Sequence, residues 1–249
     1  MYFPYLRGRQ NELLCLRELL ETNRLYDTII PIIEPVRCNS TFFTTLTKFI
    51  EADRKIIIIK NPKVGKFGDD YAELKKKIEE EADETKKNKL QLTLVNYEQF
   101  LKDPHVISGY LCDDKIISQC LEGKKNVRDI VLINTGMDTF DYYEEYGAEL
   151  KAVYTFIPKD EDFKDEVDGD TVILEDVYVK AKRNVDYIEA PDEPFSRNHL
   201  VYRKRGYAGF SDYSIVGDFY EESGFAPLAV AIHILYFGQK SELRVPNFV

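Results

Sequence analysis

Short apolar runs alternate with amphipathic stretches along most of the chain. Residues 9–23 place leucines three and four positions apart, which is the spacing of one helical face. Residues 28–35 are rich in isoleucine and predict a strand, in which Pro31 marks an edge or a bulge. Helical spacing returns at 40–54. The four successive isoleucines within 55–62 then predict a strand that is buried on both faces, as in a parallel sheet covered by helices.

The same alternation continues toward the C-terminus. Residues 70–89 carry acidic and basic side chains three and four positions apart, which is typical of a helix that faces solvent. Another helix is expected from Asp138 to Gly147. Six further strands are expected at 90–95, 106–111, 129–136, 151–156, 171–176 and 228–237.

Eight strands that alternate with helices predict an α/β fold, a (β/α)8 TIM-barrel-like single domain over residues 1–249. A doubly wound open sheet shows the same alternation and remains the competing fold, because periodicity does not report closure. Only the segment GQKSELRVPNFV follows Phe237, so the last helix is expected to be short or missing. No linker rich in proline or glycine divides the chain.

Composition narrows the classes of function. Of the 249 residues 44% are hydrophobic and 31% are charged, as in a globular domain. The formal charge of −10 and the pI near 5.0 argue against binding of nucleic acid through bulk charge. The four cysteines form no CxxC pair and are interpreted as reduced thiols. No apolar run approaches ~18 residues and no signal segment is recognised, so a cytoplasmic protein is expected.

Three segments carry a resemblance to a known family. They are MYFPYLRGRQNELLCLREL at the start, IIPIIEPV in the expected strand that follows, and GFSDYSIVGD with the later AVAIHILYF. Together they resemble the beta-protein-like family, which comprises a phage protein and its uncharacterised bacterial relatives, and ILEDVYVKAKRNVDY is similar to its bacterial branch. The resemblance implies a barrel-like α/β fold and a gene beside a small companion protein in a phage-related or antiviral defence locus. It implies no assigned reaction.

Binding sites of (β/α)8 barrels lie at the carboxyl ends of the strands. A polar residue ends almost every expected strand here, which fits a lined pocket but also fits strands that simply meet solvent. No P-loop, HExxH or GxGxxG motif narrows the chemistry further. The strand-end residues with candidate roles in ligand binding or catalysis are Glu34, Lys60, Asn61, Asn134 and Asp176.

Two of the candidates stand in apolar surroundings. Glu34 is expected to act as a general base or a metal ligand, and a capping or ion-paired role is the even alternative. His233 shares a strand face with Ala231 and Leu235. It is a candidate catalytic group that points into the barrel if the small alanines face the interior, although a lone histidine in an apolar strand is more often a core residue. The alternative for His233 is a hydrogen-bonded core histidine.

Residues 209–218 pack two glycines, two aspartates and a tyrosine into ten positions. Asp212 is expected to flank a short strand at the barrel mouth, and a role in lining a site is favoured over a role in a structural corner. With Glu34 and Asp176 it forms the predicted ligand set for a divalent metal, Mg²⁺ or Mn²⁺.

A basic tract follows the expected strand at 171–176. Because barrels often bind phosphate in their last loops, Lys180 and Arg183 are predicted to hold a phosphate group, with a solvated loop as the alternative. The leading hypothesis is a barrel that binds a phosphate-bearing ligand and hydrolyses a phosphoester with metal assistance. The alternative is a non-catalytic interaction module for a companion protein, favoured if aromatic residues such as Tyr142, Tyr143 and Tyr146 are exposed.

Overall fold

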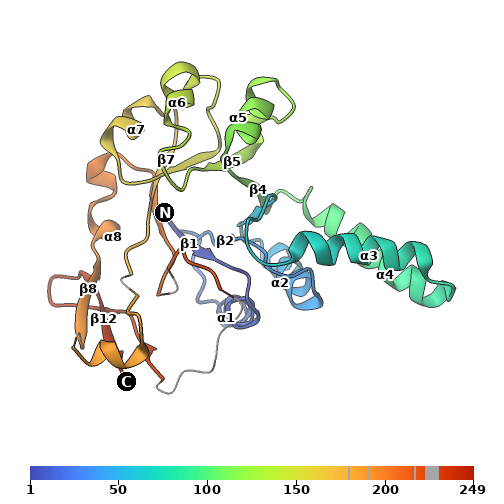
Figure 1. Cartoon of the computed structure of the whole chain (residues 1–249), viewed down its shortest axis with the longest axis horizontal. Coiled ribbons are helices and arrows are strands. Elements are labelled where there is room, and N and C mark those ends of the chain that lie inside the picture. The colour runs from blue at the N-terminus through green and yellow to red at the C-terminus, as the bar shows by residue number, and fades with distance from the viewer. Residues whose placement is uncertain (179, 190, 216, 222–229) are drawn as a thin grey trace.

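Eight parallel strands close into a barrel, as predicted (Figure 1). The computed structural model describes residues 1–178, 180–189, 191–215, 217–221 and 230–249. Every neighbouring pair in the barrel is parallel, and the last strand returns to pair with the first. The strands, in order around the barrel, are β1 (Tyr2–Leu6), β2 (Ile32–Ile33), β3 (Ile56–Ile59), β4 (Val106–Leu111), β5 (Ile130–Ile133), β6 (Tyr154–Ile157), β7 (Thr171–Glu175) and β9 (Gly209–Asp212).

The isoleucine run of β3 shows why a barrel strand needs apolar residues at every position. Ile57 and Ile59 point into the barrel, whereas Ile56 and Ile58 point outward beneath the helices. All four side chains are buried. Both faces are therefore covered, one by the barrel interior and one by the helical layer.

Closure depends on β1 and β9, which lie at opposite ends of the chain in sequence. Phe3 is paired with Ser211, 208 residues later, and the Ser211 hydroxyl donates to the Phe3 carbonyl at 2.6 Å. Gly209 is required at this joint, because a Cβ atom there would lie 2.5 Å from the Phe3 ring. The β1–β9 joint is thus closely packed at Gly209 and Ser211.

Helices cover the outside of the barrel. Asn39, Asp113 and Asp160 cap three of them by accepting hydrogen bonds from backbone N–H groups of the first turn. The outer layer consists of α1 (Gln10–Glu21), α2 (Ser40–Glu51), α5 (Asp114–Leu121), α6 (Phe140–Tyr146), α7 (Glu161–Glu166) and α8 (Asn198–Val201), with short 3-10 turns η1 (Val127–Asp129) and η3 (Arg203–Arg205). A third 3-10 turn, η2 (Asn184–Glu189), packs against β12 instead.

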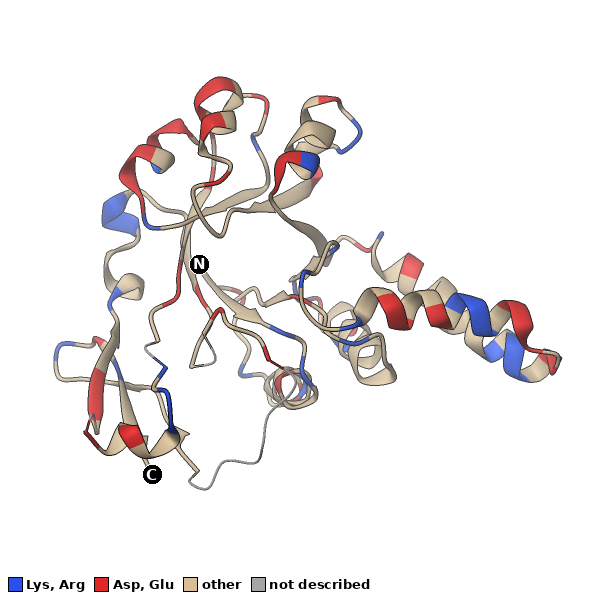
Figure 2. Ribbon diagram, viewed as in Figure 1, with Lys and Arg blue, Asp and Glu red and all other residues tan. Residues whose placement is uncertain are grey.

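Two helices between β3 and β4 form a hairpin that projects from the barrel (Figure 1). They are α3 (Phe67–Glu80) and α4 (Glu84–Phe100). Tyr97, near the end of α4, is buried against α2, whereas Leu92 and Val95 remain exposed. Lys, Arg, Asp and Glu residues are mixed along this arm, while acidic residues gather on α6 and α7 (Figure 2).

A small antiparallel sheet lies beside the barrel. β12 (Leu243–Phe248) pairs on one side with β8 (Asp192–Ser196) and on the other with β10 (Ile232–His233) and β11 (Tyr236–Phe237). Among the described residues, no helix is long and apolar enough to cross a membrane.

Two of the eight expected strands were wrong, although their number was right. Residues 90–95 belong to α4, because their apolar positions sit inside a longer helical stretch. Residues 230–237 lie in the small sheet instead of the barrel, while 228–229 fall outside the described residues. The strands that take their places are β1 and β9.

Candidate functional site

A cavity of about 200 Å³ opens at the carboxyl ends of the barrel strands. β1, β2, β5 and β9 each bring at least one side chain to it, directly from the strand or from the residue or two that follow. This is the end at which barrel proteins bind ligands. The lining residues that bear polar groups include Tyr5, Arg7, Glu34, Lys63, Thr135 and Tyr213.

A buried ion pair forms the floor of this cavity. The guanidinium of Arg7, one residue past β1, binds the Glu34 carboxylate, one residue past β2. Glu34 also accepts hydrogen bonds from the Tyr5 hydroxyl at 2.7 Å and from the backbone N–H of Lys63 at 2.7 Å. With three donors around it, the Glu34 side chain is fixed in position and in turn fixes Arg7 in place.

Two tyrosine rings flank the Arg7 guanidinium. Its central carbon lies 5.1 Å from the centroid of the Tyr5 ring and 5.3 Å from that of Tyr213. Burial, more than the charge of Glu34, raises the pKa of Tyr5, and burial likewise raises the pKa of Tyr213. Both hydroxyls are therefore neutral at physiological pH, and both rings stabilise the cation through their faces.

One nitrogen of the Arg7 guanidinium has no hydrogen-bond partner among the described residues. The Nη2 of Arg7 donates to the carbonyl of Asp218, but its buried Nε has no partner among these residues. Arg7 as a whole is only 6% exposed. A fixed, desolvated cation with an unpaired N–H group is a favourable partner for an oxyanion.

Lys63, Thr135 and Asp218 complete the polar lining of the cavity. The Lys63 ammonium is 3.7 Å from the Asp113 carboxylate, and its side chain is half exposed. Because this ion pair is long and exposed to solvent, it is weak, and the Lys63 ammonium is free to turn toward a ligand. Thr135, two residues beyond β5, adds a hydroxyl that donates or accepts.

Asp176 stands at the same end of the barrel and contacts the loop that holds Arg7. Its Oδ2 accepts a hydrogen bond from the backbone N–H of Asp218 at 3.0 Å. Burial raises the pKa of Asp176, and the neighbouring charge of Asp218 adds to the effect. Glu34, Asn61, Asn134 and Asp176 thus all follow strands at one end of one parallel barrel, as the sequence predicted.

Asp212 is a structural corner residue. Its carboxylate accepts hydrogen bonds from the Tyr2 hydroxyl at 3.0 Å and from the backbone N–H of Ser214 at 2.9 Å. Tyr2 and Phe210, which stack at 4.8 Å, lie on the outer face of the barrel wall, so Asp212 points to that side. Burial raises its pKa. The preference for a site-lining role is corrected, since the Asp212 side chain is not part of the cavity.

The predicted metal ligands are not assembled. Among the described residues, no group of three or more histidine, cysteine, aspartate or glutamate side chains is arranged to hold a metal ion. Glu34 is occupied by Arg7, Tyr5 and Lys63, while Asp212 is turned outward. A site for Mg²⁺ or Mn²⁺ built from Glu34, Asp176 and Asp212 does not fit this arrangement.

Two predicted ligand-binding amides hold the barrel together instead. Asn61 accepts from the Leu111 N–H at 2.9 Å and donates to the Leu111 carbonyl at 2.8 Å, which extends the β3–β4 pairing past the end of β3. Asn134 donates to the Phe156 carbonyl and to the Tyr143 hydroxyl, and accepts from Thr139. Asn134 uses both of its N–H donors inside the barrel, and Asn61 uses one donor and one lone pair on the Leu111 backbone, so both amides are fixed by main-chain contacts.

Lys60 lies on the outer side of the barrel wall. Its ammonium is 5.4 Å from the centroid of the Tyr97 ring of α4. Burial, together with the nearby charge of Lys125, lowers the pKa of Lys60 to about 8. Lys60 is therefore the most perturbed lysine described at this end of the barrel, but it does not line the cavity.

The basic tract lies outside the cavity as well. Arg183 forms an ion pair with Asp186, with Nη2 and Oδ1 2.7 Å apart, and its side chain is 76% exposed. The Lys180 ammonium lies 6.0 Å from the centroid of the Phe219 ring. Arg183 already has a carboxylate partner, which weakens the case for a phosphate grip there.

His233 belongs to the small sheet. Its Nδ1 lies 2.7 Å from the Asn247 Oδ1, and its ring lies edge-on to Tyr187 at 4.6 Å. The Tyr178 hydroxyl is 3.0 Å from the same nitrogen. The prediction that His233 points into the barrel is wrong, because its strand is not a barrel strand, and the alternative of a hydrogen-bonded core histidine describes it.

Arg7, Tyr5 and Lys63 were missed as candidates. The sequence did contain a signal, because in YFPYLRG the run of apolar and aromatic residues at 2–6 is followed directly by Arg7 and Gly8. Gly8 has a φ of +64°, and a Cβ atom there would lie 2.9 Å from the Ile33 side chain, so the chain turns where Arg7 meets β2. Proline within YFPYLRG concealed the strand.

A larger groove of about 800 Å³ lies outside the barrel. It runs between α2 and the α3–α4 arm, with Phe43, Leu74 and Phe100 among its lining residues. Its charged side chains pair with one another, Arg37 with Asp70 and Lys77 with Glu73. The groove has no fixed, unpaired cation comparable to Arg7 among the residues that line it.

Comparisons with family models, with curated proteins and with solved structures give no match for this chain.

Proposed function

We propose that the barrel binds a small phosphate-bearing ligand at its mouth, with Arg7 as the fixed cation. The observation that carries the proposal is the buried Arg7 guanidinium, held by Glu34 and flanked by two tyrosines, with Nε unpaired among the described residues. A planar guanidinium suits phosphate oxygens better than an ammonium does. Lys63 and Thr135 supply further donors on the same cavity.

The size of the cavity limits the ligand. About 200 Å³ holds a phosphate group with a few attached atoms, and is below the range of ~300–1,000 Å³ for drug-sized ligands. The proposal is one of binding. We attach no hydrolytic step to it, because the three carboxylates considered for a metal do not come together.

The resemblance to the beta-protein-like family supports a role in a phage-related or antiviral defence locus. It rests on residues 1–19, 29–36, 173–187 and 209–218 with 229–237. Arg7 and Glu34, the pair at the mouth, fall within the first two of these segments. A small phosphate-bearing ligand would then be a signal or a substrate in that setting.

The test is calorimetric titration with inorganic phosphate and with small phosphate monoesters at low salt. Wild type is expected to bind, and Arg7→Lys is expected to bind roughly tenfold more weakly, since a charge-assisted contact contributes ~1.5–3 kcal/mol. Lys63→Gln and Thr135→Val test the same cavity without removing the buried ion pair. Arg183→Ala is the matched control on the exposed basic tract and is expected to bind as wild type does.

If phosphate binding is lost in Arg183→Ala and kept in Arg7→Lys, the mouth is not the phosphate site. If no variant changes binding, or wild type does not bind, the proposal fails.

The second candidate is a non-catalytic interaction module for a companion protein. It is favoured by the projecting α3–α4 arm, on which Leu92 is 59% exposed and Val95 is 40% exposed. The tyrosines considered for this role support it less, because Tyr143 is buried. Loss of companion capture in Leu92→Lys/Val95→Lys, with no phosphate binding by wild type, supports this second candidate.

A further inference from the structure

One face of the small sheet carries exposed apolar side chains. Val230 is 69% exposed, Ile232 55%, Ile234 54% and Phe248 54%. Ile232 and Phe248 are directly opposite each other in the pairing of β10 with β12, so their side chains lie on the same face. A contiguous apolar patch on a folded surface marks an interaction site.

The opposite face of the same strand is already covered. Ala231 and Leu235 pack against the core of the small sheet, which includes Tyr178 and Tyr187. His233 points to the same side, where it meets Asn247. Residues 230–237 are therefore apolar on both faces, which is the pattern of a strand covered on both sides.

The two edges of the small sheet differ in their protection. β8 forms one edge and carries Asp192, Glu193 and Pro194, which discourage pairing with another strand. The other edge, VAIHILYF at 230–237, has neither a charged residue nor a proline. No other described strand pairs with β10 or β11, which both lie on the same side of β12, so their outer edge is unpaired within the described part of the chain.

Charge on the exposed face favours a neutral partner. Its charged side chains, Asp192 and Arg244, form an ion pair at 3.0 Å, and the Tyr236 hydroxyl donates to Asp192 at 3.1 Å. This face is thus neutral in a chain of net charge −10. A strongly charged partner finds no counter-charge here, whereas a second copy presents the same neutral, apolar face.

We propose that two copies of this chain associate through the exposed face and open edge of residues 230–237. Antiparallel pairing of one edge strand with its own copy across a two-fold axis is self-complementary, so both partners use the same residues. This association is separate from ligand binding at the barrel mouth, and the two are tested by different variants.

The experiment measures the molar mass of the full chain by light scattering and by sedimentation, from about 1 to 100 µM. Wild type is expected to reach twice the chain mass of 29.0 kDa. Ile232→Lys/Ile234→Lys is expected to stay monomeric over this range, with dimer affinity reduced at least about tenfold. Leu92→Lys/Val95→Lys removes two exposed apolar residues of the arm and is expected to dimerise as wild type does.

A milder variant guards against loss of folding. Ile232→Thr/Ile234→Thr keeps residues that favour strands and is expected to weaken the dimer while circular dichroism is unchanged. The His233 N–H faces the outer edge, because its partner Asn247 donates away from this strand to the Pro191 carbonyl, and the Leu235 N–H faces the same way by alternation. In wild type, exchange of these two amide hydrogens is expected to slow as concentration rises. A monomeric wild type throughout, a lysine variant that dimerises equally well, or a face that binds a different protein while the chain stays monomeric would each overturn the proposal.

Discussion

The side chains of Arg7 and Glu34 pair at the mouth of the barrel, although each belongs to a different strand end. Arg7 follows β1 and Glu34 follows β2, and both are buried. Their pairing joins the ends of two neighbouring strands, and it holds a cation where a barrel binds its ligand. The same contact therefore bears on stability and on binding.

Replacement of Glu34 by glutamine is expected to destabilise the protein strongly. It leaves the buried Arg7 charge without its counter-charge, and breaking a buried pair in this way costs ~3–5 kcal/mol. Urea unfolding measures the loss. The matched control is Asp186→Asn, which breaks the exposed Arg183–Asp186 pair and is expected to change stability little. If the two substitutions lowered the free energy of unfolding equally, burial would not be what makes the Arg7–Glu34 pair important for stability.

Asn61 is expected to matter for stability and not for ligand binding. Asn61→Ala removes both hydrogen bonds to the Leu111 backbone and leaves these two groups unpaired, a loss of ~2 kcal/mol. Asn61→Asp keeps the acceptor but sets a carboxylate oxygen against the Leu111 carbonyl oxygen, so a loss at least as large is expected. Hydrogen exchange at the Leu111 amide reports the local effect. Unchanged stability with lost phosphate binding would return Asn61 to the list of ligand contacts.

Lys60 is expected to react with amine reagents at lower pH than an ordinary lysine. Burial and the charge of Lys125 lower the pKa of Lys60 from 10.5 to about 8, so its reactive neutral form is half populated near pH 8. Competitive acetylation followed by peptide mass spectrometry gives the pH profile, with the exposed Lys115 as an internal reference. Lys125→Gln is expected to move the profile to higher pH. A profile that does not respond to this substitution would remove Lys125 as a cause.

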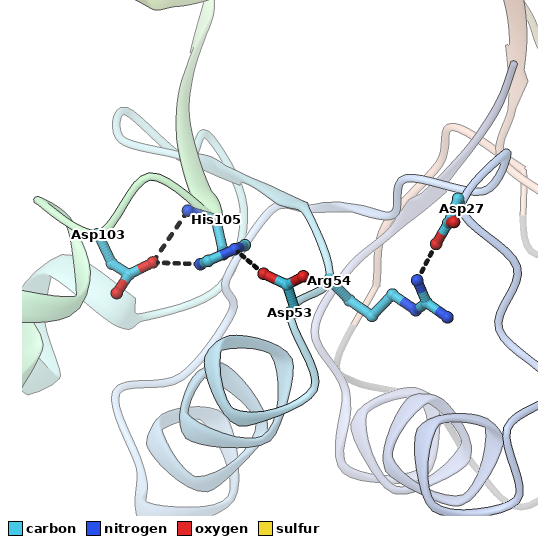
Figure 3. Close-up of polar contacts among 5 residues, drawn as sticks. All are labelled: Asp27, Asp53, Arg54, Asp103 and His105. Carbon is cyan, nitrogen blue, oxygen red and sulfur yellow. Dashed lines mark hydrogen bonds and ion pairs between the residues drawn. The ribbon is translucent and has the colours of Figure 1, made fainter.

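His105 is expected to make stability depend on pH. Figure 3 shows the imidazole between two carboxylates, with Nδ1 2.8 Å from Asp103 and Nε2 2.7 Å from Asp53. The hydrogen bonds to Asp103 and to Asp53 raise the pKa of His105 above its ordinary value of 6.5. Because the folded protein holds this proton more tightly, the added stability is full below pH ~6.5 and is lost as pH rises through the folded-state pKa.

An NMR titration of the His105 ring measures this pKa directly. Asp53→Asn is expected to lower it, and His105→Gln is expected to remove this part of the pH dependence of unfolding. The contact also joins the loop after α2 to the loop after α4, at the end of the barrel away from the mouth. A folded-state pKa at or below 6.5 would show that the imidazole is not held between the two carboxylates in solution.

The fold was readable from the sequence where apolar runs were long and uninterrupted. β3, with four isoleucines, left no alternative, and β4, β5 and β7 were likewise recognised. Residues 90–95 alternate well enough to imitate a strand, but their flanks are strongly helical and decide the outcome. β1 was hidden by Pro4, and β9 was hidden by its glycine and its two polar residues, which do not give the apolar run of a buried strand.

The sequence predicted where on the barrel the candidate site lies, but it did not predict which residues line it. The rule that barrels bind ligands at strand ends led to Glu34. The register of each strand decides whether a residue at its end points into the barrel or away from it, and the register could not be predicted from the sequence. Asp212 is the example, because one position along β9 separates a side chain inside the barrel from one outside.

Because β1 pairs with β9, the barrel closes only late in folding. During synthesis, one edge of β1 stays unpaired until β9 is made, because Ser211 lies 208 residues after Phe3. Contacts this distant in sequence slow folding, because a long loop must close before they form. Until then the nascent chain exposes a strand edge and half a barrel interior to its surroundings. Chaperones are thus expected to bind the nascent chain while its sheet is still open. A chain truncated before residue 209 lacks β9, so its barrel is expected to stay open.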